Sequence, residues 1–189
     1  MAEVRSWTGL VKAVWVQLSC VLLAVAFLPA SGGEATVEEY HVKGAFLLNF
    51  AKFVEWPEEA FKGPADPIAI CIVGTNPFGT GLAAAAQAAM AGKRTIAVRQ
   101  IQDTQQAHQC QIVFVSLAER KRVRAVLEAA QGASVLTVGE SDGFIAGGGL
   151  IEFQVENSKV KMEINADAAK HAGLHVSAKL LSLAQSGKK

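Results

Sequence analysis

The residues best able to do chemistry in this chain are its four histidines, and their spacing favours neither catalysis nor metal binding. His171 and His175 stand four residues apart, which would place both rings on one face of a helix. Gly173 lies between them, and the glutamate of a zinc-binding H-E-x-x-H helix is missing. His108 precedes Cys110 by two positions, a spacing that serves a metal only with a reduced thiol and further ligands. We therefore expect neither a metal ion nor another cofactor.

Nucleophile and phosphate-binding motifs are missing as well. No serine stands in a G-x-S-x-G elbow, and Ser116 and Ser177 are typical of helix caps. Gly74, Gly79 and Gly81 follow an apolar run, but their spacing matches neither G-x-G-x-x-G nor G-x-x-x-x-G-K-[ST]. The sequence favours a binding protein over an enzyme, unless a site assembles from residues whose spacing does not reveal it.

The charge balance argues against nucleic acid as a partner. The chain has 18 basic and 17 acidic residues, whereas a duplex-binding protein needs a strong basic excess. The basic run at 120–124 is expected to be the solvated face of a helix, partly offset by Glu119 and Glu128. No aromatic residues are interleaved with it, as single-strand binding would require.

The first 35 residues have the layout of a secretory signal. An uncharged apolar run at 13–28 follows Arg5 and Lys12 and precedes the small-residue stretch PASGGEA. We predict that residues 1–35 are a cleaved signal peptide and that the mature protein lies outside the cytoplasm, in the periplasm. The alternatives are an uncleaved membrane anchor and a lipoprotein attached through Cys20.

The remaining stretch, 36–189, has a length that suits one domain. Helical periodicity or capping predicts helices at 37–56, after Asn76, after Ser116, from Asn165 and from Ser177. Short β-branched runs predict strands at 68–73, 95–98, 112–115 and 134–138. Strict alternation predicts an antiparallel hairpin at 150–164, with one face in solvent, at the sheet edge. The fold class is therefore α/β: a three-layer sandwich with a mostly parallel central sheet, an antiparallel edge hairpin and flanking helices.

Two cysteines, Cys71 and Cys110, follow the leader. In an oxidising compartment they most simply form one disulfide, which would contribute about 4 kcal/mol to stability. Two buried free thiols are the alternative.

Segments spread along the whole mature chain resemble one family of proteins. They are VKGAFLLNFAKFVEWP at 42–57, ICIVG at 70–74, C-x-IVFVS at 110–116, VLTVGE at 135–140, GGGLIEF at 147–153, KMEIN at 161–165 and GLHVSAKLLSLA at 173–184. Together they resemble the YfiR family of periplasmic proteins, whose conserved cysteine pair falls on Cys71 and Cys110.

The resemblance implies a periplasmic repressor that binds the sensor domain of a membrane-bound diguanylate cyclase. Repression would keep cyclic di-GMP low and restrain biofilm formation until redox or envelope stress removes the repressor. The resemblance also implies a homodimer, a disulfide that contributes to stability, and an outer-membrane lipoprotein as a second possible partner. Some relatives carry a second cysteine pair, which this chain lacks.

The wet face of the edge hairpin is the expected partner-binding surface, since an exposed sheet edge is free for pairing. Its residues are Glu152, Gln154, Lys159, Lys161 and Glu163. Simple solvation of a mixed-charge face is the alternative. A second possible function is a periplasmic small-molecule sensor acting on another membrane signalling protein. Its pocket would lie at the ends of the parallel strands, near 74–81 and 139–143.

Overall fold

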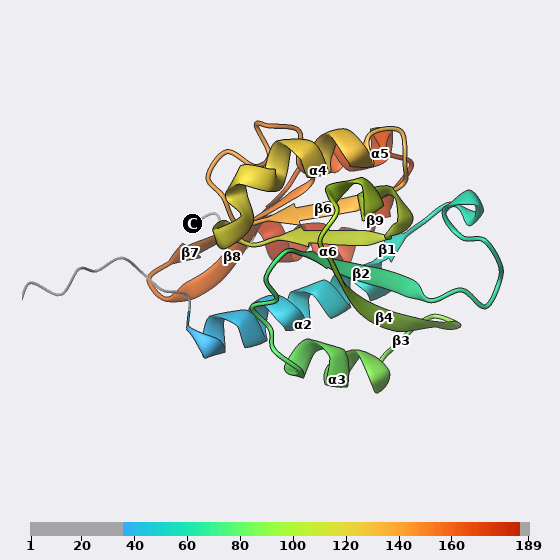
Figure 1. Cartoon of the computed structure of the whole chain (residues 1–189), viewed down its shortest axis with the longest axis horizontal. Helices are drawn as coiled ribbons and strands as arrows, with labels where there is room; N and C mark the ends of the chain where they lie inside the picture. Colours follow the sequence, from blue (N-terminus) through green and yellow to red (C-terminus); the bar gives the residue numbers. More distant parts are fainter. Residues whose placement is uncertain (1–35, 186–189) are drawn as a thin grey trace, which may run out of the picture. The chain divides into compact units, whose positions relative to one another are not determined.

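The computed structural model describes residues 36–185 (Figure 1). The predicted signal peptide, 1–35, lies outside the described residues and stays a prediction. Within 36–185, none of the helices combines the length and the apolar composition that a membrane crossing requires.

A seven-stranded sheet in the order β3-β4-β2-β5-β6-β7-β8 forms the middle layer. Its central strands run parallel, and its two edge strands, β3 and β8, each pair antiparallel with their neighbour. The strands span Ile68–Val73 (β2), Met90–Ala91 (β3), Arg94–Ile101 (β4), Ile112–Val115 (β5), Leu136–Gly139 (β6), Ile151–Glu156 (β7) and Lys159–Ile164 (β8). This arrangement confirms the predicted mostly parallel sheet and the antiparallel hairpin at its edge.

Helices cover both faces of the sheet, as Figure 1 shows. On one side lie α2 and α3, and on the other lies α4, drawn in gold. The α-helices span Val37–Phe53 (α2), Gly81–Gln87 (α3), Val123–Ala130 (α4), Ala166–His171 (α5) and Ala178–Gln185 (α6). Short 3-10 segments span Glu58–Ala60 (η1), Thr104–Gln109 (η2) and Leu117–Arg122 (η3).

Strand β2 shows why the central strands are continuously apolar. Ile70 and Ile72 join the core that α2 and α3 cover, whereas Cys71 and Val73 join the core under α4. All six residues of the strand are buried. A parallel strand that is covered on both faces has no polar position, so it forms an uninterrupted apolar run.

The segment after α2 and the segment before α6 pair in a small sheet that the sequence did not predict. β1 (Val54–Glu55) pairs antiparallel with β9 (His175–Val176). Ser177 donates its backbone N–H to the carbonyl of Phe53 at 3.0 Å, which continues the link to the end of α2. A two-residue strand has no periodicity to detect, which is why the pattern was missed.

Four predicted helix starts have different outcomes. Asn165 and Ser177 accept the expected capping hydrogen bonds from Ala168 and Leu180. The prediction for Asn76 is wrong, because α3 begins at Gly81 and the Asn76 side chain instead accepts from the N–H of Phe78 within a tight turn. The helix cap expected at Ser116 does not form either. Its side chain makes no cap bond, and η3 precedes α4.

Candidate functional site

The five predicted partner-binding residues lie on one face of the β7–β8 hairpin. The register pairs Glu152 with Glu163 and Gln154 with Lys161, and side chains of directly opposed residues share a face. Their exposure differs, however. Lys159 is exposed, while Gln154, Lys161 and Glu163 are partly buried. Whether this face binds a partner stays a prediction.

Glu152 does not belong to the exposed face, so that part of the prediction is wrong. Its exposed fraction is 6%, and its carboxylate accepts hydrogen bonds from the Ile145 N–H at 3.1 Å and from Gln154 at 3.3 Å. The carboxylate therefore fixes the loop that joins β6 to β7. Alternation along a strand cannot reveal a loop that folds back over it, which is why Glu152 was expected to be in solvent.

The same loop is anchored by Phe144, whose ring lies against Gly139 and Gly149. A side chain at either glycine would collide with this ring. Gly139, at the start of the predicted ligand pocket at 139–143, therefore makes room for a buried aromatic residue of the chain itself.

At the other half of that predicted pocket, 74–81, an internal carboxylate occupies the position next to Gly74. After β2, the Glu119 carboxylate lies against Gly74 and accepts a hydrogen bond from the N–H of Thr75 at 2.9 Å. Arg122 pairs with the same carboxylate at 3.3 Å. In open α/β sheets a bound anion commonly occupies such a position, and here an internal carboxylate takes the backbone donor.

A buried ionic cluster lies beside these strand ends. Lys43 on α2 is 3% exposed and donates to the carboxylates of Glu39 and Glu140, with 2.7 Å separating Lys43 Nζ from Glu140 Oε1. Glu140 also accepts from the Leu117 N–H at 2.8 Å and from the Tyr40 hydroxyl at 3.2 Å. The cluster thus joins α2 to the ends of β5 and β6.

The pKa of Tyr40 is raised well above its ordinary value. Burial is the largest cause, followed by the charge of Glu140 and by the hydrogen bond to its carboxylate. The hydroxyl therefore stays protonated as a donor at physiological pH, and the cluster serves as a fixed connection between layers. Sequence reasoning missed it because Tyr40 and Glu140 stand about a hundred residues apart, too far for any spacing rule.

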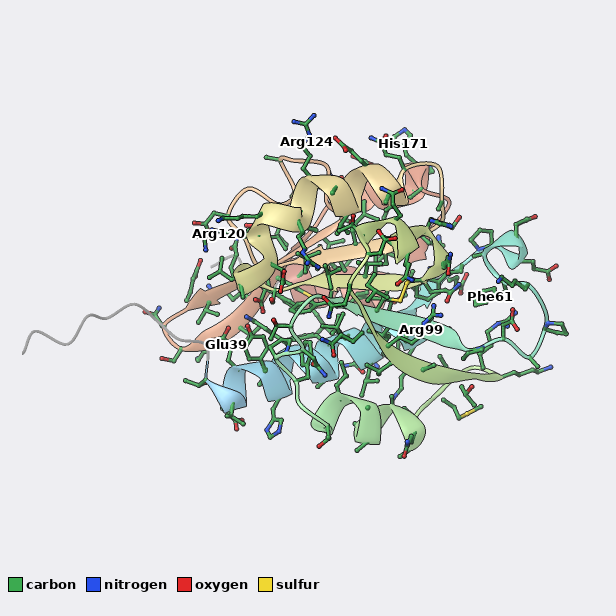
Figure 2. The ribbon with its side chains drawn as sticks, in the orientation of Figure 1. Glu39, Phe61, Arg99, Arg120, Arg124 and His171 are labelled. Atoms are coloured by element: carbon green, nitrogen blue, oxygen red, sulfur yellow. A yellow bond between two sulfur atoms is a disulfide. The ribbon has the colours of Figure 1, made fainter. Side chains whose placement is uncertain are left out.

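The predicted disulfide is present between Cys71 and Cys110, with a Cα–Cα distance of 6.1 Å. Cys71 is fully buried, and Cys110 is 2% exposed. Nη2 of Arg99 lies 3.9 Å from Cys110 Sγ, and Figure 2 shows this side chain beside the sulfur atoms. The bond ties β2 to the end of η2, and it confirms the pairing expected from the cysteine count.

A hollow with a volume of about 660 Å³ lies next to this disulfide, at the amino-terminal ends of the parallel strands. Four separate segments line it: residues 59–69, Ala97 and Arg99 of β4, residues 108–111, and residues 132–135. It lies at the opposite end of the sheet from the predicted pocket. No sequence signal pointed to it, because its walls come together only in the folded chain.

The basic run and the histidines have ordinary surroundings. Figure 2 shows Arg120 and Arg124 pointing outward over η3 and α4, and the Arg124 side chain is 90% exposed. His171 Nδ1 contacts the carbonyl of Asp167 at 2.7 Å, while His175 lies in β9. Across residues 36–185, no three histidine, cysteine or acidic side chains converge as metal ligands.

Comparison with known families decides which family the chain belongs to. The model of the YfiR/HmsC-like family matches residues 40–185, which is most of the chain. The chain belongs to the YfiR/HmsC-like family. The match extends from α2 to α6, so the disulfide, the hairpin and all of the buried cluster except Glu39 lie in the matched region.

Two other comparisons add little to the family assignment. No curated protein matches the chain. Among solved structures, a conserved domain protein from Vibrio cholerae is similar at 14% sequence identity and a TM-score of 0.44. The similarity covers 62% of this chain and 53% of the other, so the chain spans about half the length of that protein.

Proposed function

We propose that this protein is a periplasmic regulator that represses a membrane-bound diguanylate cyclase by binding its periplasmic sensor domain. Membership of the YfiR/HmsC-like family over residues 40–185 is the observation that carries the proposal. The Cys71–Cys110 disulfide supports an oxidising compartment, because such bonds persist outside the cytoplasm. Repression would hold cyclic di-GMP low and limit biofilm formation.

Repression by contact requires that the protein bind one conformation of the cyclase better than another. A ligand shifts a two-state equilibrium only by its difference in affinity for the two states. Moving a cyclase from almost fully active to almost fully inactive takes a preference of about 10⁴-fold. A rigid contact surface suits this task, since little binding energy is then lost to ordering the surface.

We assign the contact to the polar face of the β7–β8 hairpin, without Glu152. Lys159, Lys161, Gln154 and Glu163 present both charge signs beside the sheet edge. Strand β8 pairs with β7 and with no second strand among the residues described. Its outer edge can therefore accept a strand of the partner, while the side chains select that partner.

Charge reversal on this face tests the assignment. Lys159→Glu and Lys161→Glu should each weaken binding to the cyclase's periplasmic domain about tenfold, the equivalent of about 1.4 kcal/mol. Binding is measured by titration calorimetry, and cyclic di-GMP is measured in cells. Arg124→Glu is the control, because this arginine is a similarly charged surface residue on the far helix layer.

If both hairpin variants bind within twofold of the parent, the surface assignment is wrong. If the parent itself binds no periplasmic domain of any diguanylate cyclase of the same genome, the repressor proposal fails as a whole. A homodimer and an outer-membrane lipoprotein that sequesters the repressor are further parts of the proposal. Sedimentation of the protein alone, and with the lipoprotein, tests each separately.

A further inference from the structure

Strand β8 ends the seven-stranded sheet, so one row of its backbone groups lies outside the ladder. The turn between β7 and β8 has two residues, and its closing pair is Glu156 with Lys159. In such a hairpin the closing residues exchange both of their backbone hydrogen bonds, and every second pair along the ladder does the same. The bond from the Asn165 N–H to the Leu150 carbonyl, at 2.9 Å, fits this alternation.

The residues between these hydrogen-bonded pairs point their N–H and C=O groups outward, away from β7. They are Val160, Met162 and Ile164. Within residues 36–185 no further strand of the sheet lies beside them. Their side chains are apolar and pack in the core to which α2 contributes. An edge of this kind can bind a strand of another chain through its backbone.

The charged side chains of this edge make it complementary to a second copy of itself. Two copies of β8 can run antiparallel about a two-fold axis. With the axis at Met162, Lys161 of each copy lies directly opposite Glu163 of the other, and opposed unlike charges stabilise a strand pair. An axis at Lys161 or at Glu163 instead sets that residue against its own copy, which destabilises the pair. Within one chain, Lys161 pairs with Glu156, but this carboxylate is 53% exposed, so the ion pair contributes little and can be exchanged.

The register with its axis at Met162 also uses every outward backbone group. Val160 of one copy pairs with Ile164 of the other, and Met162 pairs with its own counterpart, so all three exchange backbone hydrogen bonds. The apolar face is incompletely covered at this end of the hairpin, since Val155, directly opposite Val160, is 48% exposed. The second copy's Ile164 extends the apolar row at that position. Charge, hydrogen bonding and the apolar row therefore favour the same register.

We propose that two copies of this chain join through β8, antiparallel about a two-fold axis at Met162, to form one continuous sheet. This inference rests on the homodimer proposed above and adds which surface forms it. It also makes the dimer and the cyclase complex mutually exclusive, because the same edge is assigned to the cyclase. The dimer is then a reserve that must dissociate before repression. Binding to the cyclase is therefore measured with the repressor below its dimer Kd.

Charge reversal and its rescue test the interface by sedimentation equilibrium. Lys161→Glu and Glu163→Lys should each raise the dimer Kd about tenfold or more, because each change opposes like charges at two symmetric positions. The double variant Lys161→Glu with Glu163→Lys should return the Kd to within about threefold of the parent, which a mere loss of stability would not do. Arg124→Glu, on α4, should leave the Kd unchanged.

Disulfide cross-linking tests the register. Chains with Lys161→Cys and chains with Glu163→Cys are mixed and oxidised without prior reduction, so that Cys71 and Cys110 stay bonded. The mixture should give a covalent dimer, because the two new cysteines lie opposite each other, whereas either variant alone should give none. A covalent dimer from one variant alone would place that residue on the axis and overturn the register.

Addition of the cyclase's periplasmic domain to the parent dimer tests the mutual exclusion by sedimentation velocity. The dimer should disappear as a complex with one copy of the repressor forms, and a complex that keeps two copies joined through β8 would contradict the exclusion. If the parent is a dimer whose Kd neither charge reversal changes, the interface lies elsewhere and this inference alone fails. If the parent remains a monomer up to about 100 µM, the proposed homodimer fails with it. Titration calorimetry with the monomer still decides the cyclase proposal separately.

Discussion

Removal of the disulfide should lower the melting temperature substantially, and the structure sets the size of the effect. The bond closes a loop with a sequence separation of 39 residues. The chain-entropy model gives a stabilisation of about 4 kcal/mol for a loop of this length. With an unfolding entropy of about 2.1 cal/mol/K per residue over roughly 150 residues, the melting temperature should fall by about 12 °C.

Differential scanning calorimetry on three samples checks this value. They are the oxidised parent, the parent reduced and refolded in the presence of a phosphine, and the double variant Cys71→Ala with Cys110→Ala. The reduced parent isolates the cross-link, because it keeps both buried sulfur atoms. The double variant should melt lower still by the small cost of the lost packing. If the reduced parent melts within about 3 °C of the oxidised protein, the loop-closure reasoning is refuted.

Two further predictions concern the carboxyl ends of the strands. Tyr40 is the chain's single tyrosine, so phenolate absorbance should show it titrating well above the ordinary pKa of about 10. Because a raised folded pKa favours the protonated folded state, the contribution of Tyr40 to the unfolding free energy should stay constant below about pH 10 and fall as pH rises further. The variant Tyr40→Phe should lose this fall in unfolding free energy above about pH 10. An ordinary pKa for the Tyr40 hydroxyl would contradict this account. Gly74 and Gly79 both have positive φ, at 65° and 56°, so alanine at either should cost about 1–2 kcal/mol in urea unfolding. Gly74→Ala should destabilise the protein by about 1 kcal/mol more than Gly79→Ala, because the added methyl group displaces the Glu119 carboxylate that binds the Thr75 N–H. Equal losses of stability in the two variants would show that this contact is unimportant.

Local sequence patterns predicted the elements that are buried or alternating in a regular way. β2 and β5 begin and end where the apolar runs predicted, because each is covered on both faces and needs no polar position. The β7–β8 hairpin followed from alternation, and its turn at Asn157 and Ser158 has the positive φ angles typical of a two-residue hairpin. The disulfide followed from the number of cysteines together with the predicted oxidising compartment.

Features that depend on distant residues could not be predicted in this way. Glu119 has the spacing of a capping box with Ser116, yet its carboxylate binds Thr75 because the end of β2 lies beside η3 in the folded sheet. Glu152 alternates with apolar neighbours like a solvent residue, yet the β6–β7 loop covers it. The hollow by Cys110 is assembled from four segments, and no single segment has a sequence pattern that would predict it. Spacing rules apply within an element, and these contacts join elements.

The pairing of β1 with β9 determines how much of the chain must be complete before the fold can close. Val54 lies at the end of the first described helix and pairs with Val176, and Leu180 of α6 is fully buried in the core to which α2 contributes. The helix α2 is synthesised before the other described helices, yet the part of its core that α6 completes cannot form until Leu180 has been synthesised. A polypeptide shortened before residue 176 would keep every central strand and still leave exposed the part of this core that Leu180 covers. Carboxyl-terminal truncation should therefore produce aggregation instead of a smaller folded protein.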